Sequence, residues 1–328
     1  MTSFQGARPP SQVGAVQILE NVLQLFVASV TIGCLYGLMC MGLSMIFGVM
    51  RIVNFAQGEF LMLGMYATFY ISLAFAAPGL FGAWGPFIAT ILAAPFLFLA
   101  SVVLYSGLLG DLTERRGMAE NVRHSAQLIV TLGLSLILQN GALVAFGSLP
   151  QAAKTPLSNQ AWIINLFDGD VMLFANQARV VAACVAIVMA VIMYLIVTHT
   201  ALGRSVRAAA DDPEAARYSG VNISFVYKIT FGLGAAMTAV AGGLMASYFP
   251  FQPYVGAEFI IIMYAGVVLG GMGSMLGAFW GGLIIGVIQQ MSTLVLPQQL
   301  QNATIFVIFL LILLLRPNGL LGRATERA

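Results

Sequence analysis

Long apolar runs are the feature of this sequence that most limits its fold. At least seven of them reach about 20 residues, the length that a helix needs to cross the hydrocarbon core of a bilayer. They occupy roughly two thirds of the 328 residues, so no stretch remains that would bury a separate soluble core. The sequence therefore predicts an all-α fold: a polytopic helical membrane protein with a single membrane domain.

We expect about eight or nine transmembrane helices, some of them short or interrupted. The predicted units are an N-terminal tail over residues 1–20, a membrane domain over residues 21–317 and a C-terminal tail over residues 318–328. The N-terminal stretch lacks the basic region, short apolar core and cleavage site of a signal peptide, so we expect a retained and partly disordered tail. The expected spans are 21–50, 60–76, 87–109, 126–146, 180–197, 225–248, 258–289 as two helices, and 305–315.

A charged segment, Thr198–Asn222, separates two of the apolar runs. Only 8% of the chain is charged, so a segment with three arginines and three acids must lie in water. Asp212 is a favourable N-cap residue, Pro213 fits the first helical position, and Gly220 fits the left-handed residue after a helix. The pattern predicts a short helix over Glu214–Ser219.

This short helix offers a surface for another protein. Ala215 and Ala216 leave a shallow place for a partner's side chains, while Glu214 and Arg217, three residues apart, share a face and present charges. Two interpretations stay open at this point. The segment is either a docking element or a solvated loop with one helical turn.

Arginines near the ends of the apolar runs indicate the orientation of the chain. Segments 111–124 and 199–222 each hold three arginines, so the positive-inside rule predicts that both are cytoplasmic. The loop 147–178 should then lie outside. Within it we expect a short amphipathic segment around residues 162–174.

The glycine-rich stretch 258–289 needs a break to satisfy this orientation. The stretch starts outside, and the chain should be cytoplasmic after Arg316, so the chain must cross the membrane an odd number of times between Glu258 and Arg316. The stretch and the last span, 305–315, look like two crossings, so they must contain a third. We therefore divide the stretch at residues 270–273 into two short helices.

Glycines also mark the places where we expect helices to pack closely. Gly33 and Gly37 lie four residues apart, and Gly273, Gly277 and Gly281 repeat this spacing. Small residues at this spacing let two helix backbones approach each other.

Polar residues that interrupt the apolar runs are candidates for a translocation pathway. A carboxylate at the centre of a bilayer costs about 2.5 to 3.5 kcal/mol on insertion scales, so it is usually paired or lines a wet cavity. The alternatives are that the acids only occupy helix N-termini, where the dipole favours negative charge, and that the amides only bond between helices. The candidates are Asn54, Gln57 and Glu59 before the second span, Gln139 and Asn140 in the fourth, and Glu258 at the start of the glycine-rich stretch.

A faint internal similarity connects two of these places. Residues 58–67 resemble residues 257–265 with one deletion. Our topology places Glu59 at an inner membrane end and Glu258 at an outer end, so a true repeat would be inverted. Paired helix breaks in inverted repeats point to a transport site, although chance similarity explains the match equally well.

The sequence offers little for catalysis or for other classes of partner. Both histidines, His124 and His199, fall in predicted loops, and we find no metal-ligand cluster and no nucleophile beside a base. Neither Lys154 nor Lys228 follows a phosphate-binding glycine pattern, so this chain would not hydrolyse ATP by that route. The three cysteines fall in apolar segments and are expected to be small buried hydrophobes. A net charge of +2 gives no reason to expect nucleic acid as a partner.

Several motifs resemble the branched-chain amino acid permease family of ABC importers. Residues 214–220, EAARYSG, are similar to the E-A-A-x-x-x-G pattern of importer permeases, whose cytoplasmic loop docks into the ATP-binding subunit. The resemblance covers most of residues 21–323. Its further motifs are Gly203–Ala208, Gly42–Met50, Asn54–Glu59, Ile129–Asn140 and Gly270–Ser274.

The resemblance implies a non-catalytic transport subunit in the bacterial inner membrane. It would work with a second, homologous permease, two ATP-binding subunits and an extracytoplasmic solute-binding protein. No cofactor would bind to this chain, because ATP would bind to the partner subunits. The helix with Glu214, Ala215, Ala216, Arg217 and Gly220 would couple ATP binding to alternating inward-open and outward-open states.

Departures from the family pattern leave the identity of the transported solute undetermined. The family often has His where Gln57 stands and an acid near Gln289 or Gln290, and its members handle branched-chain amino acids, urea, amides and other small solutes. One alternative is a secondary transporter or channel, which the sparse intramembrane acids disfavour. A membrane-embedded transferase is a second alternative, disfavoured because the chain lacks clustered His, Asp or Arg.

Overall fold

The computed structural model describes residues 10–76, 82–114, 120–166, 171–297, 300–315 and 319. Within these ranges, seven helices are long and apolar enough to cross a membrane, and two shorter helices, Val255–Gly270 and Gln301–Ile312, are also apolar. The predicted polytopic helical membrane protein with some short helices is therefore confirmed.

The helices and strands follow the expected spans closely. A π-helical turn, Tyr105–Leu109, joins α3 to α4. The elements are α1 (Pro10–Met50), α2 (Gln57–Ala76), α3 (Gly85–Leu104), α4 (Gly110–Glu114), α5 (Glu120–Phe146), β1 (Ala161–Leu166), β2 (Val171–Asn176), α6 (Gln177–His199), α7 (Ala201–Asp211), α8 (Pro213–Tyr218), α9 (Ile223–Met245), α10 (Val255–Gly270), α11 (Met275–Met291) and α12 (Gln301–Leu315).

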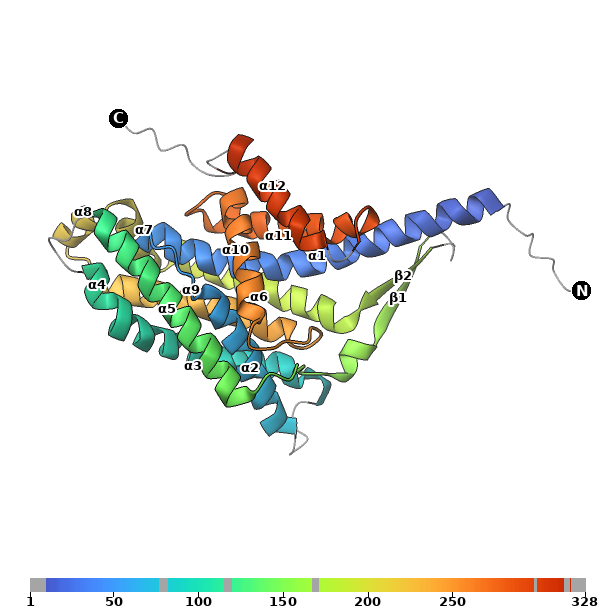
Figure 1. Cartoon of the computed structure of the whole chain (residues 1–328), viewed down its shortest axis with the longest axis horizontal. Coiled ribbons are helices and arrows are strands. Elements are labelled where there is room, and N and C mark those ends of the chain that lie inside the picture. The colour runs from blue at the N-terminus through green and yellow to red at the C-terminus, as the bar shows by residue number, and fades with distance from the viewer. Residues whose placement is uncertain are drawn as a thin grey trace, which may run out of the picture.

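The two ends of the molecule's long axis carry different elements (Figure 1). α4, α7 and α8 lie at one end, and the β1–β2 hairpin lies at the other. The segments predicted to be cytoplasmic therefore share one end, and the loop predicted to be external lies opposite them. Arg115 and Arg116 of the first cytoplasmic segment lie outside the described residues.

The amphipathic segment predicted around residues 162–174 is an antiparallel hairpin. Leu173 and Ala175 of β2 are buried, whereas Met172 and Phe174, which alternate with them along the strand, are exposed. This alternation is the period of a strand with one buried face. Residues 167–170 at the hairpin tip lie outside the described residues.

The first helix begins earlier than we predicted. α1 starts at Pro10, so residues 10–20, which we assigned to the partly disordered tail, are helical. Proline is a favourable first helical residue, and none follows it before Met50, so nothing interrupts the helix. Residues 1–9 and the predicted C-terminal tail, 318–328, lie outside the described residues except for Gly319.

Glycines bring α1 and α11 into backbone contact. A Cβ atom at Gly33 would lie 2.7 Å from the carbonyl oxygen of Leu283, and one at Gly37 would lie 2.7 Å from that of Phe279. Real Cβ atoms do not approach this closely, so α1 needs glycine at both positions to pack against α11.

The glycine-rich stretch is divided where we expected. α10 ends at Gly270 and α11 begins at Met275, with Gly273 in the turn at φ +88°. Gly277 and Gly281 then pack against α10, because Cβ atoms there would lie 2.3 and 2.1 Å from carbonyl oxygens of Gly270 and Gly266. Only glycine allows this antiparallel pair to touch through its backbones.

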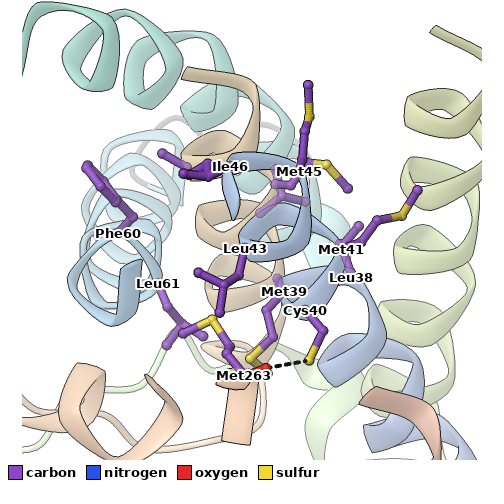
Figure 2. Packing of buried hydrophobic residues seen from close by; sticks show 14 of the residues in the cluster. Leu38, Met39, Cys40, Met41, Leu43, Met45, Ile46, Phe60, Leu61 and Met263 are labelled. Carbon is purple, nitrogen blue, oxygen red and sulfur yellow. Dashed lines mark hydrogen bonds between the residues drawn. The ribbon is translucent and has the colours of Figure 1, made fainter. Parts of the chain in front are cut away.

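Sulfur-containing side chains fill the centre of the bundle, where Figure 2 shows α1 residues facing Met263 of α10. Met39 and Met263 are fully buried, and the Cys40 thiol donates a hydrogen bond of 3.6 Å to the Met263 carbonyl oxygen. Methionine adapts to irregular gaps between helices. Cys34 and Cys40 are buried as predicted, but Cys184 lies on an exposed face of α6, because an apolar helix has a lipid-facing side that hydropathy does not identify.

Candidate functional site

The chain interrupts its helical course between α1 and α2. Residues 51–56 are not helical, and Arg51 at their start is exposed with φ +54°. The chain then enters the protein interior, since Asn54 and Gln57 are fully buried and Glu59 is 2% exposed. We call residues 51–59 the inserted segment.

Asn54 organises the start of α2. Its Oδ1 accepts a hydrogen bond of 3.1 Å from the backbone nitrogen of Ala56, and its Nδ2 donates one of 3.0 Å to Oε1 of Gln57. Asparagine favours such local bonds to the following backbone, which form a turn before a helix. Asn54 therefore ends the extended part of the inserted segment and starts α2.

Gln57 connects the inserted segment to α9. Its Nε2 donates hydrogen bonds to the carbonyl oxygen of Gly234 at 3.1 Å and to Oγ1 of Thr238 at 2.6 Å. The Thr238 hydroxyl also lies 3.5 Å from the carbonyl oxygen of Met39 in α1. Because a buried polar group without a partner costs about 1–3 kcal/mol, this network holds α1, α2 and α9 in one arrangement.

Glu59 places a carboxyl group among three helices. Its Oε1 accepts a hydrogen bond of 3.0 Å from Oγ of Ser135 in α5. Its Oε2 is buried and has no hydrogen-bond partner among the described residues. A Cβ atom at Gly256, in the first turn of α10, would lie 2.8 Å from this Oε2. The carboxyl group therefore lies at the N-termini of α2 and α10, where helix dipoles favour negative charge.

α2 and α10 begin at the same place in the bundle. A Cβ atom at Gly58 would lie 2.2 Å from the carbonyl oxygen of Gly256, so the two helix starts are in backbone contact. Our prediction that Glu59 and Glu258 lie at opposite membrane ends is therefore wrong. The inserted segment carries the chain back into the interior before α2 begins, and hydropathy does not reveal such a return.

From their common start, α2 and α10 run in opposite directions. α2 runs parallel to α9, whereas α10 runs parallel to α1, which is antiparallel to α9. This geometry is that of an inverted pair of helix starts, the arrangement that the faint sequence similarity implied. The contacts that set these directions are Gln57 with Gly234, Thr68 with Gly243, Tyr36 with Phe259, Cys40 with Met263, and Gly42 with Gly234.

α5 covers the inserted segment with a line of polar residues. Gln127, Thr131 and Ser135 are spaced four apart and so share one helix face. Gln127 donates to Thr113 of α4 at 3.2 Å, and Thr131 donates to the carbonyl oxygen of Val53 at 3.4 Å. Ser135 bonds to Glu59, as described above. We call the side of α5 that carries Gln127, Thr131 and Ser135 the polar face of α5.

The predicted pair Gln139 and Asn140 divides between two sides of α5. Gln139 continues the four-residue spacing of the polar face and is half-buried. Asn140 is exposed, and its Nδ2 bonds to the carbonyl oxygen of Leu136 in its own helix. The opposite side of α5 is apolar, with Ile129 70% and Ile137 69% exposed.

Glu258 does not join Glu59. It is exposed at the start of α10 and lines a pocket of about 210 Å³ between α10 and α12. Asn302 is the other polar residue of the lining, and the rest is mostly apolar, including Ile261 and Phe306. Among the described residues, no group of three or more His, Cys, Asp or Glu side chains lies close enough to hold a metal ion.

The short helix α8 forms as the sequence indicated. Oδ1 of Asp212 accepts hydrogen bonds from the backbone nitrogens of Glu214 and Ala215 at 2.9 and 3.0 Å, and Pro213 is the first residue. Gly220 follows the helix with φ +86°. The N-cap and the left-handed glycine therefore set both ends of α8.

α8 has an anchored side and an exposed side. Ala216 is buried, whereas Glu214, Ala215 and Arg217 are exposed. Tyr218 is 90% exposed, which the sequence analysis did not anticipate. An aromatic residue beside charged groups is typical of the residues that carry binding energy in protein interfaces.

The segment before α8 is also helical, which we did not predict. α7 is capped by Thr200, whose Oγ1 accepts from the backbone nitrogen of Gly203 at 3.1 Å. It buries Gly203, Val206 and Ala209, which are spaced three apart. The sequence did carry an amphipathic helical pattern here, because these residues recur at helical spacing between arginines, but the charged residues lower the mean hydropathy, so the segment was interpreted as a loop.

Three side chains that form hydrogen bonds with the inserted segment were missed by the sequence analysis: Thr131, Ser135 and Thr238. A signal existed for the first two, because polar residues at positions 127, 131, 135 and 139 recur with the period of one helix face. No local pattern distinguishes Thr238, whose role depends on its distance from Gln57.

A family model described as the permease component of branched-chain amino acid transport systems matches residues 25–315. The high-affinity branched-chain amino acid transport system permease protein LivH of Salmonella typhimurium is 32% identical over 94% of this chain and 97% of its own length. BraD of Pseudomonas aeruginosa, a permease of the same description, is 31% identical over 93% and 97%. Both similarities include the inserted segment and α8. This chain therefore belongs to the family of branched-chain amino acid transport permeases.

Proposed function

We propose that this chain is a membrane-spanning permease subunit of an ATP-driven ABC importer for branched-chain amino acids or related small polar solutes. The observation that carries the proposal is the family match over residues 25–315, which covers nearly all of the membrane domain. The chain itself is non-catalytic and binds no cofactor. Its contribution is half of a pathway that alternates between inward-open and outward-open states.

The partners are a second homologous permease, two ATP-binding subunits and an extracytoplasmic solute-binding protein. The chain lies in the bacterial inner membrane, with α8 and the C-terminus in the cytoplasm. Support for this orientation comes from the arginines of α7 and α8 and from the position of α4 at the same end of the molecule (Figure 1). ATP binds to the partner subunits, and α8 docks into them through Glu214, Ala215, Arg217 and Tyr218.

A contiguous route connects α8 to the inserted segment. The buried Ala216 and the hydrogen bond from the Val221 nitrogen to its carbonyl oxygen, 3.0 Å, hold α8 at the start of α9. α9 in turn accepts both hydrogen bonds that Nε2 of Gln57 donates. If the ATP-binding subunits displace α8, the helix α9 therefore transmits the displacement to the start of α2.

The first test is uptake by the complete importer in proteoliposomes. We expect leucine uptake that requires both ATP and the solute-binding protein and that is unaffected by collapse of the membrane potential. Uptake that persists without ATP and follows the membrane potential would instead identify a secondary transporter.

The second test addresses the coupling role of α8. Glu214→Lys should abolish ATP-driven uptake and release the ATP-binding subunit during purification in mild detergent, because it reverses an exposed charge on the docking face. Asp211→Lys makes the same change at an exposed acid at the end of α7 and should have a much smaller effect. Normal uptake by Glu214→Lys would remove the coupling role.

A further inference from the structure

Glu258 exposes a carboxyl group on a face of the bundle that lies within the membrane. Its neighbour Phe259 packs edge to face on Tyr36 of α1, with ring centroids 6.0 Å apart. Arg51, just past the end of α1, follows Tyr36 by 15 residues, or about 22 Å of helix. Since the hydrocarbon core of a bilayer is about 30 Å thick, Glu258 lies inside it, in the half away from Arg51.

Lipid does not suit this exposed carboxyl group. A carboxylate that faces acyl chains is costly, so ionisable groups of membrane helices face other protein or a water-filled cavity. Other outer faces of the bundle are different. Every exposed side chain of α3 from Ile91 to Val103 is apolar, and so is every exposed side chain of α6 from Ile187 to Leu195. The faces of α3 and α6 therefore suit lipid, whereas the face formed by α10 and α12 suits water and a neighbouring subunit.

The pocket between α10 and α12 opens on this face. Its volume of about 210 Å³ is below the roughly 300–1,000 Å³ of pockets for drug-sized ligands, so it suits a small solute. Glu258 and Asn302 are its polar residues. Its other residues are branched, aromatic or small apolar ones, namely Ile261, Ile262, Ile305, Phe306 and Ala257. The pocket thus combines one negative charge, one amide and an apolar wall.

A chain of hydrogen bonds behind the pocket orients Asn302. The Tyr36 hydroxyl donates to Oε1 of Gln289 at 2.7 Å, and Nε2 of Gln289 donates to Oδ1 of Asn302 at 3.3 Å. Tyr36 and Gln289 are both buried. Because Oδ1 of Asn302 is the acceptor in this chain, its Nδ2 keeps two N–H donors, and no described residue accepts from them. Glu258 likewise has no hydrogen bond or ion pair with a described residue.

We propose that this pocket binds a branched-chain amino acid as it moves between the two permeases. This inference rests on the proposed function for the identity of the solute. The Glu258 carboxylate accepts from the ammonium group, Nδ2 of Asn302 donates to the carboxylate, and the apolar wall contacts the aliphatic side chain. The second permease covers the open side of the pocket, so the pocket is this chain's part of the shared pathway.

The test measures how well leucine protects a thiol in the pocket of the complete importer, held in nanodiscs so that reagents reach both sides. Cys34, Cys40 and Cys184 of this chain are first replaced by alanine with leucine uptake retained. Ile261→Cys places a thiol in the pocket, one helical turn after Glu258. Val307→Cys, the control, places one on an exposed side of α12 that does not line the pocket.

Each variant is treated with the cationic trimethylammonium methanethiosulfonate and with the anionic sulfonate reagent, without nucleotide and during ATP turnover. Rates are divided by those with a free thiol. We expect Ile261→Cys to react in at least one of the two states, about tenfold faster with the cationic reagent, because Glu258 attracts it. Leucine should slow this reaction. Val307→Cys should show neither the charge preference nor the protection.

Substitutions at the two polar residues separate their roles. In the Ile261→Cys background, Glu258→Gln should remove the charge preference and raise the leucine concentration for half-protection at least tenfold. Asn302→Leu should raise this concentration but keep the charge preference. Glu20→Gln, which removes a carboxylate from the outer part of α1, should change neither quantity. Leucine without its ammonium group, 4-methylpentanoate, should protect weakly, and Glu258→Gln should not weaken its protection further.

The inference is wrong if the Ile261→Cys thiol stays unreactive in both states while leucine uptake proceeds, because the second permease or lipid then fills the pocket. Equal protection of Ile261→Cys and Val307→Cys by leucine would also overturn it, as would leucine protection that Glu258→Gln leaves unchanged. Failure of the proposed function looks different. In that case the wild-type importer takes up no leucine, while the charge preference at Ile261→Cys still shows whether the pocket is a water-filled anionic site.

Discussion

Removal of the cap of α8 tests the coupling mechanism quantitatively. Oδ1 of Asp212 accepts two hydrogen bonds, of 2.9 and 3.0 Å, from the first turn of a six-residue helix. Loss of such a cap costs about 0.5–2 kcal/mol, and a helix this short has almost no stability of its own. Since 1.4 kcal/mol is about tenfold in an equilibrium constant, Asp212→Ala should lower the equilibrium constant for folding of α8 by roughly 2- to 30-fold.

If the ATP-binding subunit recognises only folded α8, its apparent Kd should rise by up to the same factor, because affinity scales with the competent fraction. The assay is titration of the purified permease pair with the ATP-binding subunit, followed by leucine uptake. Asp212→Asn should restore both, since asparagine caps helices as well as aspartate does. Asp211→Ala removes the same charge one residue earlier without removing the cap.

Two results would refute this reasoning. Equal weakening by Asp211→Ala and Asp212→Ala would assign the effect to charge and not to helix formation. A loss of affinity in Asp212→Asn as large as in Asp212→Ala would show that the aspartate itself contacts the partner. The thermal stability of the membrane domain should stay unchanged in all three variants, because α8 lies at the surface.

Three further substitutions have expected outcomes. Gly64→Ala should lower the thermal denaturation temperature in detergent, because its Cβ would lie 2.0 Å from the Ala239 carbonyl oxygen, whereas Gly141→Ala, with no atom within 4 Å, should not. Gln57→Leu should cost about 1–3 kcal/mol of stability and most of the uptake, measured together, because it removes both bonds to α9. Tyr218→Ala should weaken binding of the ATP-binding subunit at least tenfold in a titration without changing the denaturation temperature.

Features encoded within a few neighbouring residues were predictable. α8 follows from Asp212, Pro213 and Gly220, whose preferred conformations determine a helix's ends without help from the rest of the chain. The break after Gly270 followed from the orientation that the arginines indicate, which requires an odd number of membrane crossings between Glu258 and Arg316. α7 escaped prediction because its charged residues lower the mean hydropathy of an amphipathic segment. The predicted start of the first helix was wrong because helices continue past the end of an apolar run.

The candidate site was predictable only in part. The polar residues Asn54, Gln57 and Glu59 stand out in an apolar chain because burying them is costly. Their partners Thr131, Ser135 and Thr238 are ordinary helix residues, and only the arrangement of α5 and α9 shows that they matter. Glu258 looked equivalent to Glu59 in sequence, yet it faces a separate pocket beside α12.

The sequence by itself determined the membrane class, most of the spans and the short helix α8, because the transfer of apolar side chains and the preferences of caps are local energies. The tertiary structure alone decided that the chain returns into the bundle at residues 51–59 and that α2 and α10 begin in contact through Gly58 and Gly256. It also decided that one oxygen of Glu59 is satisfied and the other is not. These properties depend on distances between residues up to about two hundred positions apart, which no local energy specifies.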